Sequence, residues 1–509
     1  MKKAFVLLIA AALMGSAGAA KSEAEEVRIA GGSHLDAFDP QLEVTSLSVA
    51  MHIYDTLVDF GDENYGSIIP SLAERWDNSE DGLTWTFYLK KGVKFSDGSP
   101  FNADSVKFTL ERILDPKTAS PNRAKVAEIS KVDVVDDYIV KITTRKPYAP
   151  LLENLATYHL AMLSRSATSK YSVLEYGMKP VGTGPYMLES YDISGETVLI
   201  RNPNYFGTPG IPDRISYTPV PEVSARVIML QTGEVDIATG LSPESVPPLE
   251  ADPNIEVISK PSTMMVSFTH QMWKGAPYDN KLVRQAMMYA VDREAIVKTI
   301  LGGYGVVPKG PFSPGVQAFA EFGGYEYNPE KAKELLAQAG YPNGFSTIAL
   351  APEGRYMKAR EVSEAVQGYL AQVGINIELK MSEWATYVTE FQSTLVDRGM
   401  HMLGSSIPTA HWRIERIWGT QKMPDNDHLP PNTSQYSNPE VDRLLAEASQ
   451  NFSLEERNKL YAQAEKLVWE DAPELWLFGQ SQLAGVRKGF SGYKFYGNQD
   501  WRLDRVVKQ

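Results

Sequence analysis

Hydrophobic and polar residues alternate in several short runs along the first half of the chain. Residues 84–95 show this most clearly, because tryptophan, phenylalanine and leucine occupy every second position at their start. A period of two is typical of a β-strand with one buried face. Residues 131–143 and 196–201 predict further strands, and residues 27–60 predict a strand, a loop and a helix. We therefore expect a β-rich first half with interspersed helices.

In the second half, apolar residues recur every three or four positions, which is the spacing of one helix face. The longest stripe consists of Val362, Ala365, Val366, Tyr369, Leu370 and Val373. Asn328, Asn438 and Ser453 each stand where a helix N-cap is favoured, and the first two precede a proline. Gly340 suits the end of the helix that begins after Asn328. The second half is thus predicted to be mainly helical.

The N-terminus has the three parts of a secretory signal peptide, which we assign to residues 1–20. Lys2 and Lys3 precede an unbroken apolar run from residue 4 to residue 14, and small residues follow up to Ala20. The run is too short to span a bilayer, and a buried N-terminal helix is the alternative. No cysteine stands at the cleavage site, so we expect an exported protein without a lipid anchor, in a Gram-negative periplasm.

Composition narrows the functional classes. The chain has 509 residues, of which 43% are hydrophobic and 22% charged, so it is long enough for two large lobes or about three domains. The net charge of −13 falls by two more without the N-terminal lysines, which argues against nucleic acid as a partner. The absence of cysteine excludes disulfides, thiol catalysis, zinc–thiolate sites and iron–sulfur clusters.

Motifs of common enzymes are missing. There is no Gly-x-Ser-x-Gly, His-Glu-x-x-His or Walker motif, and Pro308 interrupts the glycine pattern that starts at Gly303. The seven histidines show no metal-binding spacing. We therefore expect a protein that is not an enzyme and holds no metal or cofactor. A secreted hydrolase remains the alternative class, because a pair of catalytic carboxylates leaves no recognisable spacing.

Several segments occur in the order typical of one receptor family. They are residues 70–76, 82–87, 92–100, 102–106, 181–186, 202–206, 233–237, 283–286, 291–293, 327–332 and 339–342. Together they resemble the family 5 extracytoplasmic solute-binding proteins, the peptide- and nickel-type receptors of ABC importers. One segment alone is a weak signal, whereas the ordered series is specific.

The resemblance implies an α/β fold, namely a two-lobe periplasmic binding protein of type II, similar to cluster C. Lobe I is expected to hold residues 25–265 plus 485–509, with an extra subdomain at about 60–185. Lobe II is expected at residues 266–484. The hinge would consist of two crossing segments, near residues 260–268 and 478–486. A ligand that touches both lobes would stabilise their closed arrangement.

The resemblance also implies where the ligand binds. Peptide-binding members often carry an arginine before a long lobe II helix that meets the ligand carboxylate, and Arg355, followed by Tyr356, stands in the matching stretch 352–358. A guanidinium suits this role because it grips a carboxylate through two parallel hydrogen bonds. The alternative is a surface arginine at a helix start.

One segment departs from the family pattern. Peptide-binding members carry an aspartate for the peptide ammonium, but residues 405–413 contain no carboxylate. They offer His411 and Trp412 instead, and the indole is suited to stack on a ring or a sugar face. Anionic, amine-blocked or sugar-like ligands are therefore favoured over ordinary peptides with a free amine. Packing in the core is the alternative for both side chains.

Three further residues are candidates from the resemblance. Trp384 is similar to an aromatic residue at a strand end that often faces the cleft. His270, with Gln271 and Trp273 close behind it, follows the first expected hinge crossing. His34 lies in a loop from which members of the family touch their ligands. Core or hinge packing is the alternative for Trp384 and His270.

The expected function is a monomeric periplasmic receptor that delivers a small solute to ABC transporter permease subunits by lobe closure. A peptide or modified peptide is the first choice of ligand, with an oligosaccharide or metal chelate as alternatives. His428 would serve a nickel chelate, although a solvated acidic loop explains it more simply. A role in signalling, or as a holdase, is a third hypothesis.

Overall fold

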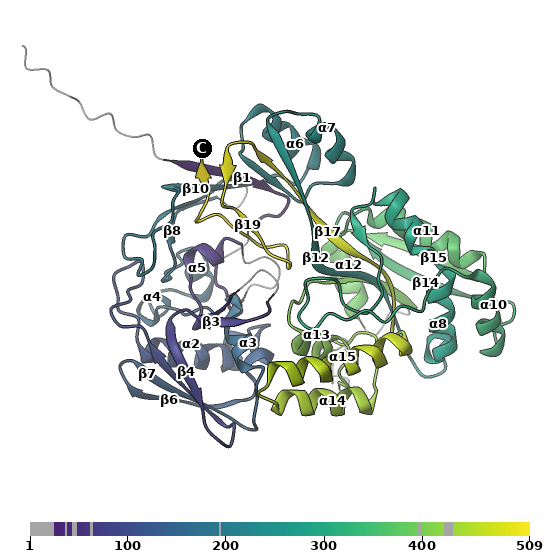
Figure 1. Cartoon of the computed structure of the whole chain (residues 1–509), viewed down its shortest axis with the longest axis horizontal. Coiled ribbons are helices and arrows are strands. Elements are labelled where there is room, and N and C mark those ends of the chain that lie inside the picture. Colours follow the sequence, from purple (N-terminus) through teal and green to yellow (C-terminus); the bar gives the residue numbers. More distant parts are fainter. Residues whose placement is uncertain are drawn as a thin grey trace, which may run out of the picture.

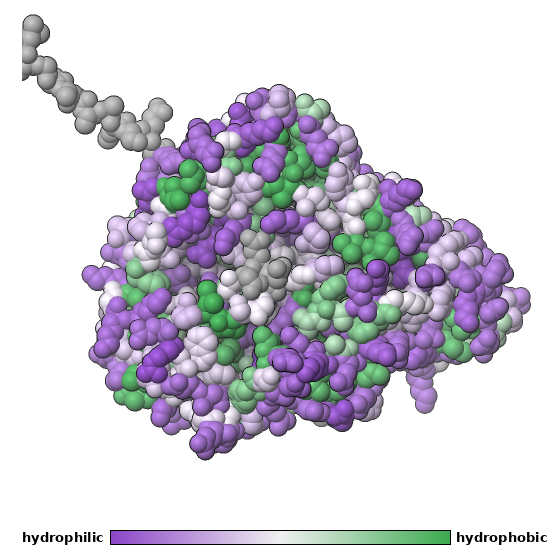
Figure 2. Space-filling model, viewed as in Figure 1, coloured by the Kyte–Doolittle hydropathy of each residue, from purple (hydrophilic) through white to green (hydrophobic). Residues whose placement is uncertain are grey.

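The structure is a computed structural model, and it describes residues 25–35, 38–42, 48–61, 65–192, 195–393, 399–421 and 431–509. The predicted signal peptide lies outside the described residues. Two lobes stand side by side and are joined by two long strands (Figure 1). The face seen in Figure 2 is mostly hydrophilic, with hydrophobic residues in small separate patches. Within the described ranges, no helix has the length and apolar character needed to cross a membrane.

The two crossing strands are β12 (Ile255–His270) and β17 (Glu474–Arg487), which pair antiparallel. They lie in the middle of an 11-stranded sheet that continues into both lobes. In spatial order this sheet contains β15 (Ile375–Ser382), β14 (Phe345–Pro352), β16 (Met400–Ser405), β12, β17, β11 (Ile237–Thr239), β1 (Glu26–Gly31), β10 (Arg214–Pro219), β9 (Thr197–Arg201) and β8 (Tyr186–Tyr191), with β13 (Gly305–Val306) beside β17. The register of β12 against β17 shifts between Pro261 and Met265, so the pairing is irregular within the crossing.

Hydrophobic cores define the lobes. Lobe I contains three cores. The first is drawn from residues 27–54, 158–237 and 484–506, and the second from residues 57–162. The third is drawn from residues 230–255 together with Ala30 and Leu483. Lobe II contains one large core within residues 264–478 and a small one beside α12 (Trp384–Gln392). The segment after β17 therefore packs in lobe I, although it follows lobe II in the sequence.

A four-stranded antiparallel sheet forms a subdomain of lobe I. Its order is β4 (Ala73–Asn78), β5 (Thr84–Leu89), β7 (Ile139–Thr144) and β6 (Ile129–Asp136). The period-two pattern is confirmed at β5, whose Trp85, Phe87 and Leu89 are buried, but this strand ends at Leu89. The single strand predicted at 131–143 is wrong, because a turn at residues 137–138 divides it into β6 and β7.

The remaining elements are short in lobe I and longer in lobe II. Lobe I has the strand pairs β2 (Val58–Phe60) with β3 (Ile68–Pro70), β18 (Phe490–Ser491) with β21 (Val507–Lys508) and β19 (Lys494–Phe495) with β20 (Trp501–Arg502). Its helices are α1 (Ala50–Ile53), α2 (Ala103–Leu114), α3 (Leu151–Leu155), α4 (Arg165–Thr168), α5 (Val173–Gly177), α6 (Val223–Thr232) and α7 (Val246–Glu250). Lobe II has α8 (Lys281–Ala290), α9 (Arg293–Ala295), α10 (Pro329–Gln338), α11 (Ala359–Ala371), α12, α13 (Ala410–Ile417), α14 (Pro439–Gln450) and α15 (Leu454–Asp471).

The predicted helix starts in lobe II are confirmed. The Asn328 side chain accepts a hydrogen bond of 2.9 Å from the Lys331 N–H, and Asn438 and Ser453 cap α14 and α15 in the same way. The apolar stripe of α11 faces the core, where Val362, Val366 and Leu370 are fully buried.

The glycine turn at 181–186 fixes the contact between α1 and the start of β8. A Cβ on Gly182 would lie 2.0 Å from the Ile53 carbonyl oxygen, and one on Gly184 would lie 2.5 Å from the His52 carbonyl oxygen. Only glycine allows this approach of two backbones. Thr183, between them, donates a hydrogen bond of 2.9 Å to Asp55 Oδ2.

Candidate functional site

A cavity of about 200 Å³, which we call the interlobe pocket, is lined by both lobes. Lobe I contributes β2, η2 (Arg123–Val126), η3 (Tyr158–Leu160) and residues 496–500, and lobe II contributes residues 406–416. A cavity built from both lobes is the place where a ligand is able to influence their approach.

One part of the interlobe pocket holds two cations beside one aromatic ring. The Lys125 Nζ lies 5.3 Å from the centre of the Trp412 ring, and the Arg416 guanidinium carbon lies 5.8 Å from it. Trp412 and Arg416 are four residues apart on α13 and so share a helix face. Lys125 belongs to η2 of lobe I and is only 7% exposed. Its Nζ donates a hydrogen bond of 2.7 Å to Asn122 Oδ1.

Burial makes the charged form of both cations less favourable. Burial, and then the charge of Arg416, lowers the pKa of the Lys125 ammonium from 10.5 to about 7. Burial also lowers the pKa of Arg416. Nearby His159 has its imidazole pKa held well below 6.5 by burial and by both cations, so it is neutral near pH 7. In the part of the chain that the structure describes, no carboxylate forms an ion pair with Lys125 or Arg416.

Another part of the interlobe pocket is acidic. Asp59 Oδ1 accepts the Phe60 N–H at 2.8 Å, and Asp59 Oδ2 lies 3.9 Å from Arg502 Nη1. Asp500 accepts hydrogen bonds from Ser48 Oγ at 2.9 Å and from Asn498 Nδ2 at 2.7 Å. Burial raises the pKa of Asp59 despite the opposing effect of Arg502. Lobe I thus supplies carboxylates to a pocket whose lobe II segment 405–413 has none.

Among the seven residues predicted to bind ligand, Trp412 is the one that lines the interlobe pocket. His411, its neighbour, points into the contact between the lobes. Its ring lies 5.8 Å from Tyr148 of lobe I and 5.8 Å from Tyr461 of lobe II. Burial lowers its pKa to about 3, so His411 is a neutral packing residue here.

Arg355, Tyr356 and Trp384 do come together, but away from the interlobe pocket. The exposed Arg355 guanidinium carbon lies 5.1 Å from the centre of the Trp384 ring, and Tyr356 meets Trp384 edge to face at 6.4 Å. The Tyr356 hydroxyl is buried and accepts the Gly404 N–H at 2.8 Å. Lys358, just after them, pairs with Glu244 of lobe I at 3.1 Å. The cluster therefore lies at the lobe II side of a second contact between the lobes.

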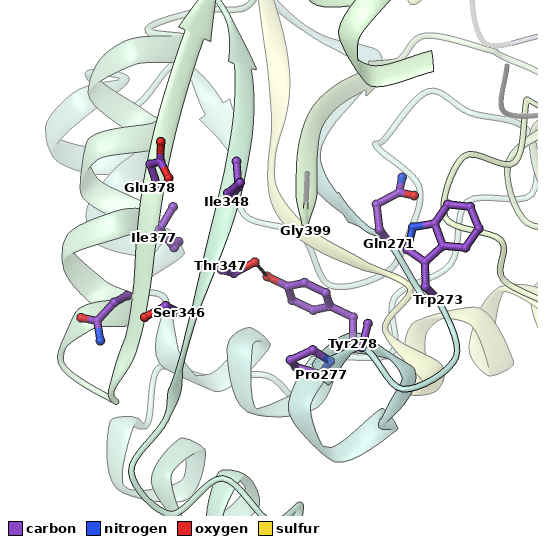
Figure 3. A pocket seen from close by; sticks show the side chains of 12 residues that line it. Gln271, Trp273, Pro277, Tyr278, Ser346, Thr347, Ile348, Ile377, Glu378 and Gly399 are labelled. Carbon is purple, nitrogen blue, oxygen red and sulfur yellow. Dashed lines mark hydrogen bonds between the residues drawn. The ribbon is translucent and has the colours of Figure 1, made fainter. Parts of the chain in front are cut away.

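His270 packs in the core of lobe II. Its ring is fully buried and stacks on Tyr278 at 5.0 Å, and burial holds its pKa well below 6.5. Its neighbours Gln271 and Trp273 line a second cavity, of about 610 Å³ (Figure 3). In this cavity the Tyr278 hydroxyl donates to Thr347 Oγ1 at 2.9 Å.

The lining of the second cavity is drawn wholly from lobe II, so it offers a ligand no contact with lobe I. Gln271 and Trp273 follow the end of β12 in lobe II and do not line the interlobe pocket. His34 is exposed in the loop after β1 and does not line either cavity. His428 lies outside the described residues.

The lobes also touch through a buried ion pair. Arg457 of α15 donates to Glu153 of α3 at 2.7 Å, and their side chains are 9% and 4% exposed. The Ala149 N–H donates to the Ser449 carbonyl oxygen at 2.8 Å beside them. This contact and the interlobe pocket both involve residues in or directly after α3.

Sequence reasoning missed Lys125, His159, Arg416, Asp59 and Asp500. A signal existed for Arg416, since its spacing from Trp412 places both on one helix face. No local pattern indicates the other four, because they come from separate segments of lobe I that meet only in the fold.

Comparisons with known proteins agree with one another. The family model for bacterial extracellular solute-binding proteins, family 5 Middle, matches residues 67–425. The glutathione-binding protein GsiB of Escherichia coli O1:K1 / APEC is 34% identical over 496 residues, or 95% of this chain and 94% of that protein. GsiB of Escherichia coli strain K12 is 33% identical with the same coverage.

Solved structures show the same fold. The ABC transporter-associated periplasmic binding protein DppA from Helicobacter pylori, in complex with peptide STSA, superposes with a TM-score of 0.82 at 28% identity, over 95% of this chain and 98% of that one. AgaA of A. tumefaciens R10, in complex with agropinic acid, has a TM-score of 0.79 at 25% identity, over 94% and 98%. The expected α/β, two-lobe, type II binding-protein fold is confirmed. The chain belongs to the family 5 bacterial extracellular solute-binding proteins.

Proposed function

We propose that this protein is a periplasmic receptor that captures a short peptide or modified peptide in the interlobe pocket and delivers it to the permease subunits of an ABC importer. The observation that carries the proposal is the lining of this pocket by both lobes, with cations, carboxylates and an aromatic ring together. A peptide has the matching groups, namely a carboxylate, an amine and apolar side chains. The names of the relatives support this class, since GsiB binds glutathione and DppA was solved with a tetrapeptide.

The geometry favours a peptide over an oligosaccharide. Trp412 is only 8% exposed and has cations beside its ring, so it offers little open face to a sugar. The proposal assigns binding and lobe movement to this protein, which is the role that the names of its relatives give.

The test is to identify what the protein binds and whether binding moves the lobes. Small molecules released by denaturing freshly purified protein are identified by mass spectrometry, and calorimetry is then run with glutathione, Ser-Thr-Ser-Ala and Met-Leu. We expect at least one peptide to bind and to reduce the radius of gyration in small-angle scattering. Absence of binding for all three, together with no peptide among the released molecules, would overturn the proposal.

A further inference from the structure

We propose that the interlobe pocket selects acidic ligands, namely short peptides with two carboxylates, one of which lies between Lys125 and Arg416 beside the Trp412 ring. The inference rests on the proposed function, because it names the class of peptide that the same pocket takes. The family resemblance favours Arg355 as the partner of the ligand carboxylate. The inference places this carboxylate at Lys125 and Arg416 instead.

The first step is geometric. Lys125 and Arg416 approach the same indole ring, at 5.3 Å and 5.8 Å from its centre, but they belong to different lobes. A carboxylate held by both therefore touches both lobes at once. A guanidinium and an ammonium both bind a carboxylate through charge-assisted hydrogen bonds.

The second step is the charge around the two cations. Nearby acidic groups have other partners: Glu153 pairs with Arg457 at 2.7 Å, and Glu415 faces Lys146, whose charge opposes the effect of burial on its pKa. Asn122 gives Lys125 a neutral oxygen only, at 2.7 Å. Among the described residues, the buried Lys125 and the half-buried Arg416 thus remain for the ligand to neutralise.

The third step compares ligand charges. An ordinary dipeptide brings one carboxylate and one ammonium, so it neutralises one cation at most. With one carboxylate between Lys125 and Arg416, a second carboxylate on the same peptide balances the remaining positive charge, and the ammonium is left for the acidic part of the pocket, at Asp59 and Asp500. The two-carboxylate peptide is therefore the class that matches the whole pocket.

The experiment on the natural protein uses two ligand pairs that differ by one negative charge. Ala-Glu is compared with Ala-Gln, and glutathione with its monoethyl ester, by calorimetry at pH 6.5. We expect the member with the extra charge to bind at least about tenfold more tightly in each pair that binds, which is the effect of about one good charged contact.

Variants then assign the effect to the two cations. Lys125→Met and Arg416→Met should each reduce the preference for the acidic member to less than about threefold, whereas Lys125→Arg should keep it. Lys141→Met, at an exposed lysine of β7, is the matched control and should change nothing. Thermal melting of each variant shows whether it is folded, and the ligand pairs on the natural protein remain decisive if one is not.

The outcomes separate the inference from the proposed function. Equal affinity for the acidic and neutral members overturns the inference and leaves a peptide receptor in place. A preference that survives both methionine variants also overturns it, because the cations would then play no part. Failure of all four ligands, together with Ser-Thr-Ser-Ala and Met-Leu, overturns the proposed function and the inference with it.

Discussion

Replacing Lys125 by methionine is expected to stabilise the ligand-free protein while it weakens the binding of acidic ligands. Methionine keeps most of the volume of the lysine side chain but carries no charge. In the ligand-free protein the Lys125 ammonium is buried and has no counter-ion among the described residues, so its charge is a cost to folding. Most substitutions of buried residues destabilise the folded protein. A variant that is more stable but binds acidic ligands more weakly therefore identifies a residue whose charge is needed for the ligand.

The size of the effect follows from the pKa of Lys125, which burial and Arg416 lower from 10.5 to about 7. At about 1.4 kcal/mol for each pH unit, the charged ammonium costs the fold about 5 kcal/mol below pH 7. Loss of the hydrogen bond to Asn122 offsets about 1–3 kcal/mol of this. A gain of about 2–4 kcal/mol remains, which corresponds to a rise in Tm of about 2–4 °C for a chain of this length.

The assay is calorimetric melting of the ligand-free protein at pH 6 and pH 9, with Lys141→Met as the control. Between pH 7 and 10.5 the unfolded state binds more protons at Lys125 than the folded state does, so the natural protein gains stability as pH rises. The advantage of Lys125→Met should therefore shrink at pH 9. A variant that melts below the natural protein at pH 6, or whose advantage is the same at both pH values, would refute the reasoning.

Three further predictions concern binding. Affinity for Ala-Glu should be highest below about pH 7 and fall above it, because the pKa of the Lys125 ammonium is about 7 in the absence of ligand. Arg416 stays charged and His159 stays neutral over this range, so Lys125→Arg should remove the fall in affinity. Arg355→Ala should change the dissociation constant by less than about threefold, since Arg355 is exposed and lies outside the interlobe pocket; a loss of about 30-fold or more would place the ligand carboxylate at Arg355 instead. Glu153→Gln should weaken binding about 10- to 100-fold and increase the radius of gyration of the bound form in small-angle scattering, because it leaves the Arg457 charge unpaired between the lobes. Unchanged affinity would show that this ion pair does not hold the lobes together.

Local elements could be predicted because they depend on neighbouring residues. The N-caps at Asn328, Asn438 and Ser453 and the buried stripe of α11 follow from hydrogen bonding and burial within one helix. The division of residues 131–143 was missed because both strands continue the same alternation through a short turn, which no glycine or proline marks. The 11-stranded sheet could not be derived at all, since it pairs β12 with β17 across more than 200 residues of chain.

The site shows the same limit more sharply. Trp412 was predicted and lines the interlobe pocket, and α13 could have added Arg416 by helical spacing. The role of Lys125 could not be predicted, because it depends on residues of lobe II that are distant in the sequence. A lysine in η2 is expected at the surface from the sequence. Only the fold shows that Lys125 is 7% exposed and that no described carboxylate pairs with it.

The position of the two cations also suggests how binding becomes movement. Lys125 is in lobe I and Arg416 in lobe II, so bringing the lobes together in the absence of ligand buries two like charges and disfavours their approach. A ligand carboxylate between them reverses the sign of this interaction. Moving a two-state equilibrium from 1:99 to 99:1 takes about 5.5 kcal/mol, and relief of the repulsion between Lys125 and Arg416 supplies a part of it. Neutralising this cluster therefore favours lobe closure, and a neutral ligand that fills the same volume should close the lobes less.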